Sequence, residues 1–462
     1  MQPMQISLCN KSERLASIFV EKSQIQLLNA IFMIYYPMNR RGRMLLEFSC
    51  SNHKSIRGEI LFSAIAGTDR SHTENIEKIA DQDVLKSAVI YGANGSGKSN
   101  FIDAISFVKN LVVTSIGNQP GQGILQAPNK LDGYAQKSDY KMQFVVDGIR
   151  YAFGFSLRNM LVEEEYLYYF PKGKQTKIFE RNEEEYSAGR SYKNRFNSCN
   201  DVLKPNRLML SCAANFSSVD EVISAYRFFT DNLVVYSAIN HDNWMNYSLH
   251  QINVEPETKA TVLKFLDALG TGIKDIHVDI KKEDMDISQL PSFLADDFKK
   301  MLVQDKVNKI SAKVVYANFE TDLLSEESDG IKKLFGLLCP FIDVIEKGKV
   351  LVCDELETGL HEALLFGLVK QFILTKGKKP AQLIFTTHET GLLNLDLFRR
   401  DQIWFTEIKA SDRSTDLYSL VEIKNVRKDE NFGKGYITGK YGAIPMLNLN
   451  FAHLIGSNGE ED

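Results

Sequence analysis

The residues best suited to chemistry lie between Gly92 and Ser99, which read G-A-N-G-S-G-K-S. This stretch fits the pattern G-x-x-x-x-G-K-[ST], in which backbone N–H groups and a helix N-terminus surround anionic phosphates. Lys98 would reach the β- and γ-phosphates, and the Ser99 hydroxyl would hold Mg²⁺. The alternative is a glycine-rich turn with an incidental lysine. We assign to nucleotide binding Gly92, Ala93, Asn94, Gly95, Ser96, Gly97, Lys98, Ser99 and Asn100.

Two adjacent acids and a histidine, each following an apolar run, supply further groups for hydrolysis. Asp354 and Glu355 follow Val-Leu-Val-Cys, and His388 follows Gln-Leu-Ile-Phe-Thr-Thr. Asp354 would orient the Mg²⁺ shell, and Glu355 would orient or deprotonate the attacking water. His388 could hydrogen-bond a γ-phosphate, although a lone histidine is more often structural. We assign Glu355, His388 and Lys98 to catalysis, and Ser99 and Asp354 to the metal.

These side chains need strands and helices to position them. The apolar run 88–91 predicts a short buried strand before the loop, and helical spacing predicts a helix from Ser99 through Asn110. The all-apolar run before Asp354 predicts a strand buried on both faces, as in a parallel sheet covered by helices. Carboxylates at the C-terminal end of such a strand project toward the crevice where ligands bind in open α/β sheets. The sequence therefore predicts an α/β fold.

Composition limits the class of protein. Of 462 residues, 44% are hydrophobic and 25% charged, and 55 Lys and Arg face 59 Asp and Glu. A domain that coats nucleic acid is usually more basic, so any nucleic-acid contact must be local. The apolar run 27–36 is too short to span a bilayer and has no signal-peptide cleavage site. The six cysteines are scattered without metal-ligand spacing. We expect a cytoplasmic protein without a membrane segment.

The chain divides into four parts. Residues 1–43 have mixed composition and no clear period, and we expect either a loosely attached extension or a start codon placed too early. Residues 44–216 begin a folded head: strand patterns alternate around Asp147-Gly148, which predicts a hairpin in an antiparallel sheet. Helical periodicity dominates 217–320, including 290–304, and predicts a compact, mainly helical insert. Residues 321–462 carry the second half of the head.

Three polar features have ordinary structural interpretations. The segment 69–83 is expected to be a surface loop or short helix, and the acidic runs 163–165 and 183–185 are expected to be solvated turns. Ser328-Asp329-Gly330 precedes an apolar helical segment, 331–338, so Ser328 would cap the helix and the acidic residues would face its dipole.

Together these pieces resemble the ATPase head of the ABC superfamily, in the branch with SMC proteins, RecF-like repair proteins and the overcoming-lysogenisation-defect nucleases. Gly92–Ser99 matches the Walker A loop, 350–355 the Walker B strand with its catalytic glutamate, and His388 the switch histidine. Residues 357–361 stand where the D-loop should be. The resemblance implies an ABC-type P-loop head with a mixed or parallel core sheet and an antiparallel β subdomain, and it implies ATP and Mg²⁺ as cofactors.

The resemblance also implies an assembly. Ser328-Asp329-Gly330 occupies the place of the signature motif, although it departs from L-S-G-G-Q. In the family this helix N-terminus reaches the ATP of the opposite protomer, which predicts homo-oligomers built from ATP-sandwich dimers. We accordingly add Ser328 and Gly330 to the nucleotide-binding set, together with Lys54 from the segment Ser51–Ile56. The Q-loop glutamine has no clear position, and Gln143 is one candidate.

A narrower resemblance rests on both ends of the head. Phe48-Ser-Cys-Ser-Asn-His-Lys-Ser-Ile, Glu327-Ser-Asp-Gly-Ile-Lys-Lys-Leu and Gly439-Lys-Tyr-Gly-Ala-Ile-Pro look like stand-alone ATPases of bacterial anti-phage operons, such as the PARIS-type and Rlo-type ATPases. In that group the partner is a separately encoded TOPRIM-type nuclease or RloB-like effector. Because only about a hundred residues follow Asp354, we expect no fused TOPRIM domain there. We therefore expect a sensor or scaffold ATPase that holds and releases such an effector when a phage-encoded trigger is present.

Two other functions compete with this one. A RecF- or SMC-like repair ATPase would clamp DNA, and the near-neutral charge counts against it. A transporter ATPase is disfavoured because the segments around Phe48 and Gly439–Pro445 are not transporter-like.

Overall fold

The computed structural model describes residues 42–237, 241–283, 307–375, 377, 379–427 and 430–444. The expected extension therefore lies almost wholly outside the described residues, as do the helical pattern at 290–304 and the Pro445 end of the C-terminal motif. The division of the chain into four parts stays a prediction.

A six-stranded sheet forms the centre of the head, in the order β11-β15-β16-β5-β17-β18. Its strands are β11 (Leu233–Tyr236), β15 (Val350–Cys353), β16 (Gln382–Thr386), β5 (Ser87–Gly92), β17 (Ile403–Ile408) and β18 (Thr415–Ser419). The first five run parallel and β18 is antiparallel to β17. β5, β15 and β16 are buried along their whole length, as the apolar runs predict.

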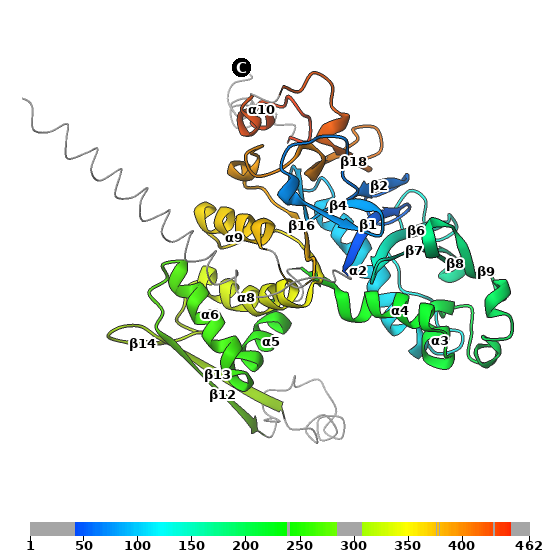
Figure 1. Ribbon diagram of the computed structural model, residues 1–462, viewed down its shortest axis with the longest axis horizontal. Helices are drawn as coiled ribbons and strands as arrows, with labels where there is room; N and C mark the ends of the chain where they lie inside the picture. The colour runs from blue at the N-terminus through cyan, green and yellow to red at the C-terminus, as the bar shows by residue number, and fades with distance from the viewer. Residues whose placement is uncertain are drawn as a thin grey trace, which may run out of the picture.

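Helices cover both faces of this sheet (Figure 1). α2 (Lys98–Thr114) packs on the face that carries Ala88 and Ile90, while α8 (Asp329–Lys347) and α9 (Glu362–Leu374) pack on the face that carries Val89 and Tyr91. Alternate residues of β5 thus belong to two separate hydrophobic cores. The short α10 (Phe432–Ile437) adds Phe432 to the second core.

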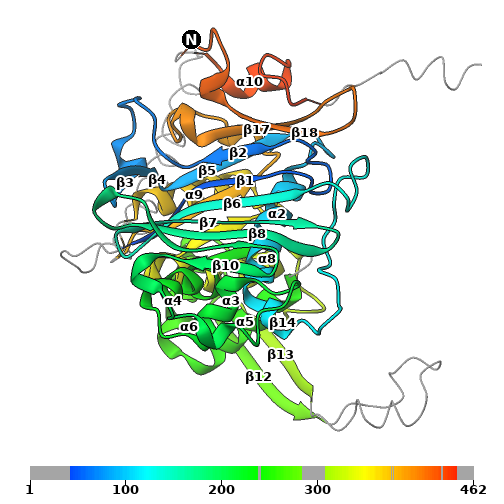
Figure 2. The ribbon, with the colours of Figure 1, turned by 90° about the vertical axis from the view of Figure 1, so that its right-hand side faces the viewer.

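A seven-stranded antiparallel sheet lies beside α2, in the order β10-β9-β8-β7-β6-β1-β2. Its strands run side by side in Figure 2 and comprise β1 (Arg43–Cys50), β2 (Ile60–Ser63), β6 (Ser138–Val146), β7 (Ile149–Arg158), β8 (Leu161–Phe170), β9 (Thr176–Asn182) and β10 (Glu185–Ala188). The predicted hairpin joins β6 to β7, with Asp147 and Gly148 at φ 51° and 86°. α3 (Met209–Phe216) and α4 (Asp220–Arg227) contribute to the same core.

The prediction of a mainly helical insert at 217–320 is incomplete. α4, α5 (His241–Val254) and α6 (Pro256–Ala268) are present, but the segment also holds the antiparallel strands β12 (Asp275–Glu283), β13 (Val307–Val315) and β14 (Glu320–Asp322). β12 and β13 project together away from the head (Figure 1). Apolar residues alternate along β12 at Ile276, Val278 and Ile280, a period-2 pattern that the helical assignment overlooked. β11 also falls in this range but belongs to the central sheet.

Two polar stretches differ from their expected structure. Residues 69–83 include a β-hairpin, β3 (Ile76–Ile79) with β4 (Gln82–Leu85), rather than only a loop or short helix. The acidic run 163–165 is part of β8, and Glu165 is 1% exposed because alternation turns its side chain into the core. The run 183–185 does lie at an exposed turn. No helix in the described ranges is both long and apolar enough to cross a membrane.

Candidate nucleotide site

The glycine-rich loop connects the end of β5 to the start of α2, as predicted. Gly95 and Gly97 have φ of 76° and 106°, a region that side chains other than glycine rarely adopt. A Cβ on Gly97 would lie 2.0 Å from Thr415 Oγ1, and one on Gly92 would lie 2.3 Å from Thr406 Oγ1. A Cβ on Gly95, by contrast, would meet nothing within 4 Å. The loop is therefore packed against β17 and β18 on one side and open on the other.

Hydroxyl groups of the two neighbouring strands fix the loop. Ser96 Oγ and Thr406 Oγ1 are 2.6 Å apart, and Thr415 Oγ1 donates to the Ser96 carbonyl at 2.9 Å. Beside the first half of the loop lies a cavity of about 400 Å³, whose lining includes Asn94, Gly95 and Arg413. The backbone of the loop is thus held in place before any ligand arrives.

Lys98 is 5% exposed, and its ammonium lies over the loop. Nζ donates to the carbonyls of Gly92 at 2.8 Å and Ala93 at 3.3 Å. Burial lowers the pKa of Lys98 to about 8, against the opposing negative charges of Asp354, Glu357 and Glu355. A buried ammonium bonded only to carbonyls, with negative charge around it, matches the position that the motif assigns to a phosphate-binding lysine.

Asp354 and Glu355 follow β15 directly, and both are held by Thr386 at the end of β16. Thr386 Oγ1 donates to Asp354 Oδ1 at 2.6 Å and accepts from the Glu355 N–H at 2.8 Å. The pairing of Cys353 with Phe385 across the parallel strands places these residues side by side. Glu355 has φ 47°, which is uncommon for a residue other than glycine and recurs at functional sites.

His388 lies at the same edge of the sheet, two residues after Thr386. Its N–H donates to Glu357 Oε1 at 2.7 Å. Partial burial, and then the charge of Lys98, lower the pKa of His388, so its imidazole is neutral at pH 7. Lys98, Asp354, Glu355 and His388 thus lie just beyond the C-terminal ends of three parallel strands, β5, β15 and β16, at the edge where the sequence predicts them.

The signature-like residues serve a local structural purpose as well. Ser328 caps α8 by accepting from the Ile331 N–H at 3.4 Å. A Cβ on Gly330 would lie 2.4 Å from the Gly359 carbonyl oxygen, so only glycine fits against this D-loop-like segment. No hydrogen bond joins Ser328 or Gly330 to Gly92–Asn100 in the part of the chain that the structure describes. Their predicted role in binding nucleotide therefore stays a prediction about a second protomer.

Lys54 and Asn100 lie at the base of the loop. Asn100 Nδ2 donates to Ser55 Oγ at 2.6 Å, and Lys54 Nζ forms an ion pair with Asp103 of α2 at 2.7 Å. These contacts join the segment after β1 to the first turns of α2. Whether the two side chains also contact nucleotide stays a prediction. Gln143 donates to Glu47 within the antiparallel sheet at 2.6 Å, which does not identify it as the Q-loop residue.

The sequence analysis assigned no individual role to Thr386, Lys333 or Glu357, which contact Asp354, Glu355 or His388. Lys333 of α8 donates from Nζ to the Glu355 carbonyl at 2.7 Å. Glu357 Oε2 is buried without a hydrogen-bond partner in the structure. Each residue had a signal in the sequence. Lys333 lies within an apolar helix face, Thr386 belongs to a threonine pair that follows an apolar run, and Glu357 is a third acid close to Asp354 and Glu355.

The donor set fits a magnesium ion held with a polyphosphate. The described residues contain no cluster of three or more His, Cys, Asp and Glu side chains that could hold a metal by themselves. Mg²⁺ is commonly bound by one or two protein oxygens together with substrate phosphates. Ser99, the second residue of α2, and Asp354, whose Oδ1 is oriented by Thr386, supply such oxygens.

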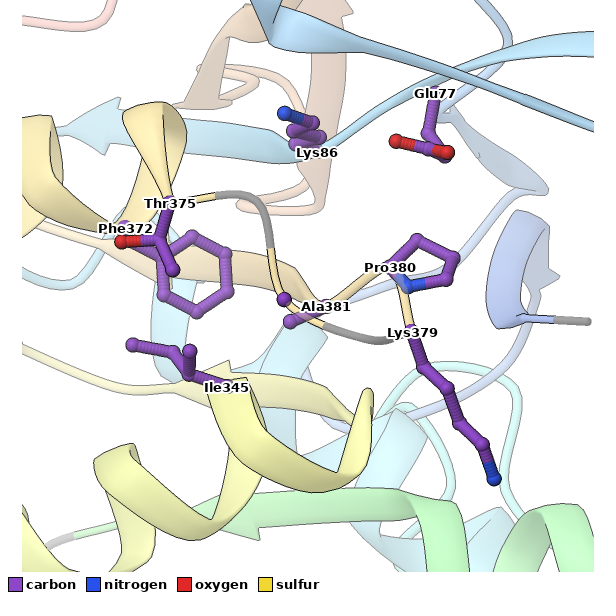
Figure 3. A pocket seen from close by; sticks show the side chains of 9 residues that line it. Glu77, Lys86, Ile345, Phe372, Thr375, Lys379, Pro380 and Ala381 are labelled. Atoms are coloured by element: carbon purple, nitrogen blue, oxygen red, sulfur yellow. The ribbon is translucent and has the colours of Figure 1, made fainter. Parts of the chain in front are cut away.

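A second cavity lies at the opposite edge of the sheet, near the N-terminal ends of β5, β15 and β16. Its lining includes Glu77, Lys86, Phe372 and Pro380, and Figure 3 shows these side chains around a narrow space. The volume is about 20 Å³, which is room for about one water molecule. This cavity is too small for a nucleotide and lies away from the glycine-rich loop.

Comparisons with known proteins agree with the motifs. The family model described as "AAA domain, putative AbiEii toxin, Type IV TA system" matches residues 87–209 and 213–394. No curated protein matches the chain significantly.

Solved structures of ATPase heads are distantly similar. The SMC head domain from Thermotoga maritima is 15% identical, covers 81% of this chain and 98% of its own, and has a TM-score of 0.38. The SmcHead bound to the C-winged helix domain of ScpA has 14% identity, coverage of 81% and 97%, and a TM-score of 0.39. RecF–ATP, the recombination mediator, has 14% identity, coverage of 83% and 100%, and a TM-score of 0.37. Likenesses at this level do not bear on function.

Proposed function

This chain belongs to the family described as "AAA domain, putative AbiEii toxin, Type IV TA system", and from that membership we propose that it binds ATP with Mg²⁺ and hydrolyses it to ADP and phosphate. The observation that carries the proposal is the meeting of Lys98, Asp354, Glu355 and His388 at one edge of the central sheet. The glycine-rich loop presents backbone N–H groups and the N-terminus of α2 to the phosphates. Lys98 turns from the loop carbonyls to the β- and γ-phosphates.

The remaining residues have separate roles in the hydrolysis of ATP. Ser99 and Asp354 would hold Mg²⁺, which would neutralise charge on the phosphates. Glu355 orients the attacking water and accepts its proton. His388, neutral at pH 7, donates a hydrogen bond to the γ-phosphate and loses that partner when phosphate leaves.

Three variants test the ATPase proposal. We expect Lys98→Ala to abolish measurable ATP binding, and Glu355→Gln to bind ATP normally but hydrolyse it at least about 100-fold more slowly. Glu184→Gln is the matched control, because Glu184 lies at an exposed turn between β9 and β10. Phosphate release and equilibrium binding of a fluorescent ATP analogue measure the two steps. Hydrolysis by Glu355→Gln at the wild-type rate would remove Glu355 from its assigned role.

We further propose that ATP joins two copies of the chain and that the assembly holds a separately encoded toxic nuclease, released when a phage-encoded trigger is sensed. The family's description, which names a toxin–antitoxin system, supports this placement. Only glycine fits at position 330 beside Gly359, and this close contact supports a well-defined surface at the start of α8 that a second copy could contact. Co-purification from the native operon, in wild-type and Glu355→Gln forms, tests it. A stoichiometric neighbouring-gene product supports the proposal, and a self-associated ATPase that carries only DNA refutes it.

One observation favours the repair-type alternative. A cavity of about 300 Å³ between α2, α5 and α8 is lined by Lys109, Lys349, Trp244 and Tyr247, among others. Lysines beside aromatic rings can bind single-stranded nucleic acid by charge and stacking. The chain has two tryptophans, and Trp404 is 5% exposed, so quenching of Trp244 by an oligonucleotide would report occupancy. Salt-dependent quenching supports DNA binding, and unchanged fluorescence at low salt counts against it.

A further inference from the structure

We propose that Lys333 positions the catalytic Glu355, and thereby makes hydrolysis depend on α8 of the same chain. The inference rests on the proposed ATPase function. Lys333 is 6% exposed, and its Nζ donates to the Glu355 carbonyl oxygen at 2.7 Å. Its ammonium reaches a residue 22 positions away in the chain, across the interface between α8 and the end of β15.

The backbone of Glu355 needs such support. At φ 47° it adopts the left-handed conformation, which costs free energy for any residue with a Cβ and persists where the surroundings fix it. Its carbonyl accepts from Lys333 and also from the Thr358 N–H at 3.2 Å, while its N–H donates to Thr386. Both main-chain polar groups of Glu355 are therefore held by elements outside β15. Fixing them fixes the direction of the Cα–Cβ bond, and hence where the carboxylate can reach.

The choice of a lysine is informative because a buried ammonium is costly unless it is compensated. Burial lowers the pKa of Lys333, and the nearby charges of Glu357, Glu355 and Asp354 oppose that shift. Within the described ranges Lys333 forms no ion pair with a carboxylate within 4 Å. The ammonium thus stabilises the carboxylates from a distance, while it donates its hydrogen bond to a main-chain carbonyl. Lys333 therefore occupies no carboxylate oxygen of Asp354 or Glu355, which accept instead from Thr386 and Thr358.

The same helix carries the signature-like turn. Lys333 follows Gly330 by less than one turn of α8, and Gly330 packs against Gly359. α8 therefore contacts the catalytic segment at two points, at the carbonyl of Glu355 and at Gly359. A ligand or protomer that displaces the N-terminus of α8 would move both points together. The arrangement makes Glu355 responsive to whatever engages Ser328 and Gly330.

The test compares Lys333→Met with Lys332→Met, a control at the neighbouring, half-buried lysine of the same helix. We expect Lys333→Met to lower kcat about 10- to 100-fold, as loss of an outer partner of a catalytic group typically does. The Kd for a fluorescent ATP analogue should stay within about twofold of wild type, because the phosphate loop is untouched. Lys332→Met should hydrolyse ATP normally. Lys333→Arg, which keeps a buried cation and donor, should recover part of kcat.

A double mutant separates positioning from general damage. If Lys333 acts through Glu355, Lys333→Met in a Glu355→Gln background should cause no further loss of the residual rate. The inference is overturned if Lys333→Met keeps kcat within about twofold of wild type. It is also overturned if the variant weakens nucleotide binding in parallel with kcat, or if the two losses multiply. A wild-type chain whose ATPase rate does not exceed that of Lys98→Ala would instead refute the proposed function, and this inference with it.

Discussion

Removing the hydroxyl of Thr386 should disorganise both Walker B acids at once. Thr386 is 0% exposed, and Thr386→Val keeps the side-chain shape while removing the group that donates to Asp354 and accepts from the Glu355 N–H. A hydrogen bond to a charged group contributes about 1.5 to 3 kcal/mol, and leaving a buried N–H unpaired costs about 1 to 3 kcal/mol. The sum spans about 2.5 to 6 kcal/mol. We expect about 3 kcal/mol, because the carboxylate of Asp354 is only half-buried and can recover water.

Thr375→Val is the control for the loss of stability in Thr386→Val. Thr375, at the C-terminal end of α9, is half-buried, and among the described residues its hydroxyl donates one hydrogen bond, to the Gln371 carbonyl. That variant should lose about 0.5 to 1.5 kcal/mol and keep full activity. Urea unfolding followed by tryptophan fluorescence, to which Trp404 in β17 of the same sheet contributes, measures the stabilities.

Activity separates the two threonines further. Thr386→Val should hydrolyse ATP about 10- to 100-fold more slowly than wild type, because Asp354 loses its orientation and Glu355 one of its backbone anchors. The reasoning is refuted if Thr386→Val unfolds at the same urea concentration as Thr375→Val, or if its ATPase rate matches that of Thr375→Val. Either result would mean that the two hydrogen bonds do not organise the acids.

Three further changes have defined outcomes. Gly330→Ala places a Cβ 2.4 Å from the carbonyl oxygen of Gly359 and should lower both the stability and the ATPase rate. Gly367→Ala is the control in α9, because a Cβ there meets nothing within 4 Å. It should be neutral or stabilise the protein by about 0.5 to 1 kcal/mol. Glu165→Ala should lose about 3 to 5 kcal/mol in urea unfolding, because it removes the carboxylate partner of the buried Arg181 and leaves two N–H groups at the start of α3 without an acceptor, while Glu164→Ala should change stability little. The pKa of Lys98 is about 8, and bound phosphates would raise it. ATP affinity should therefore be highest and constant below pH 8 and should decrease above pH 8 by up to about tenfold per pH unit. Lys98→Arg should abolish this dependence of ATP affinity on pH.

The parts of the site that contact ligand could be predicted because they are contiguous in sequence. Gly92–Ser99 places its glycines, lysine and serine within eight residues, and β5 and α2 begin and end within a few residues of their predicted limits. Asp354 and His388 each follow an apolar run that favours a buried strand. Their meeting then follows from the geometry of parallel sheets, in which successive C-terminal ends share one edge.

The insert could not be predicted to the same extent. Helical periodicity in 217–320 was strong enough to hide two other signals, the alternation of apolar residues in β12 and the short apolar run of β11. β11 has four residues, and its partner β15 lies more than a hundred residues further along the chain. A four-residue run cannot be assigned to a sheet from its own composition, because its burial depends on a strand that is remote in sequence. The same reasoning applies to Glu165, whose burial depends on α3 and Arg181.

The residues that hold Glu355 have a signal of a different kind. Lys333 stands within the apolar face that α8 presents to the core, next to Leu334 and Phe335, and Thr386 ends a strand that is otherwise buried and mostly apolar. Each is a polar side chain where the surrounding pattern calls for an apolar one, so each must find a partner inside the protein. Lys333 bonds to the main-chain carbonyl of Glu355, and Thr386 bonds to the Asp354 carboxylate and the Glu355 N–H. A polar residue that interrupts an apolar run within a few positions of a motif is therefore a candidate for positioning that motif, even when the motif's own consensus does not include it.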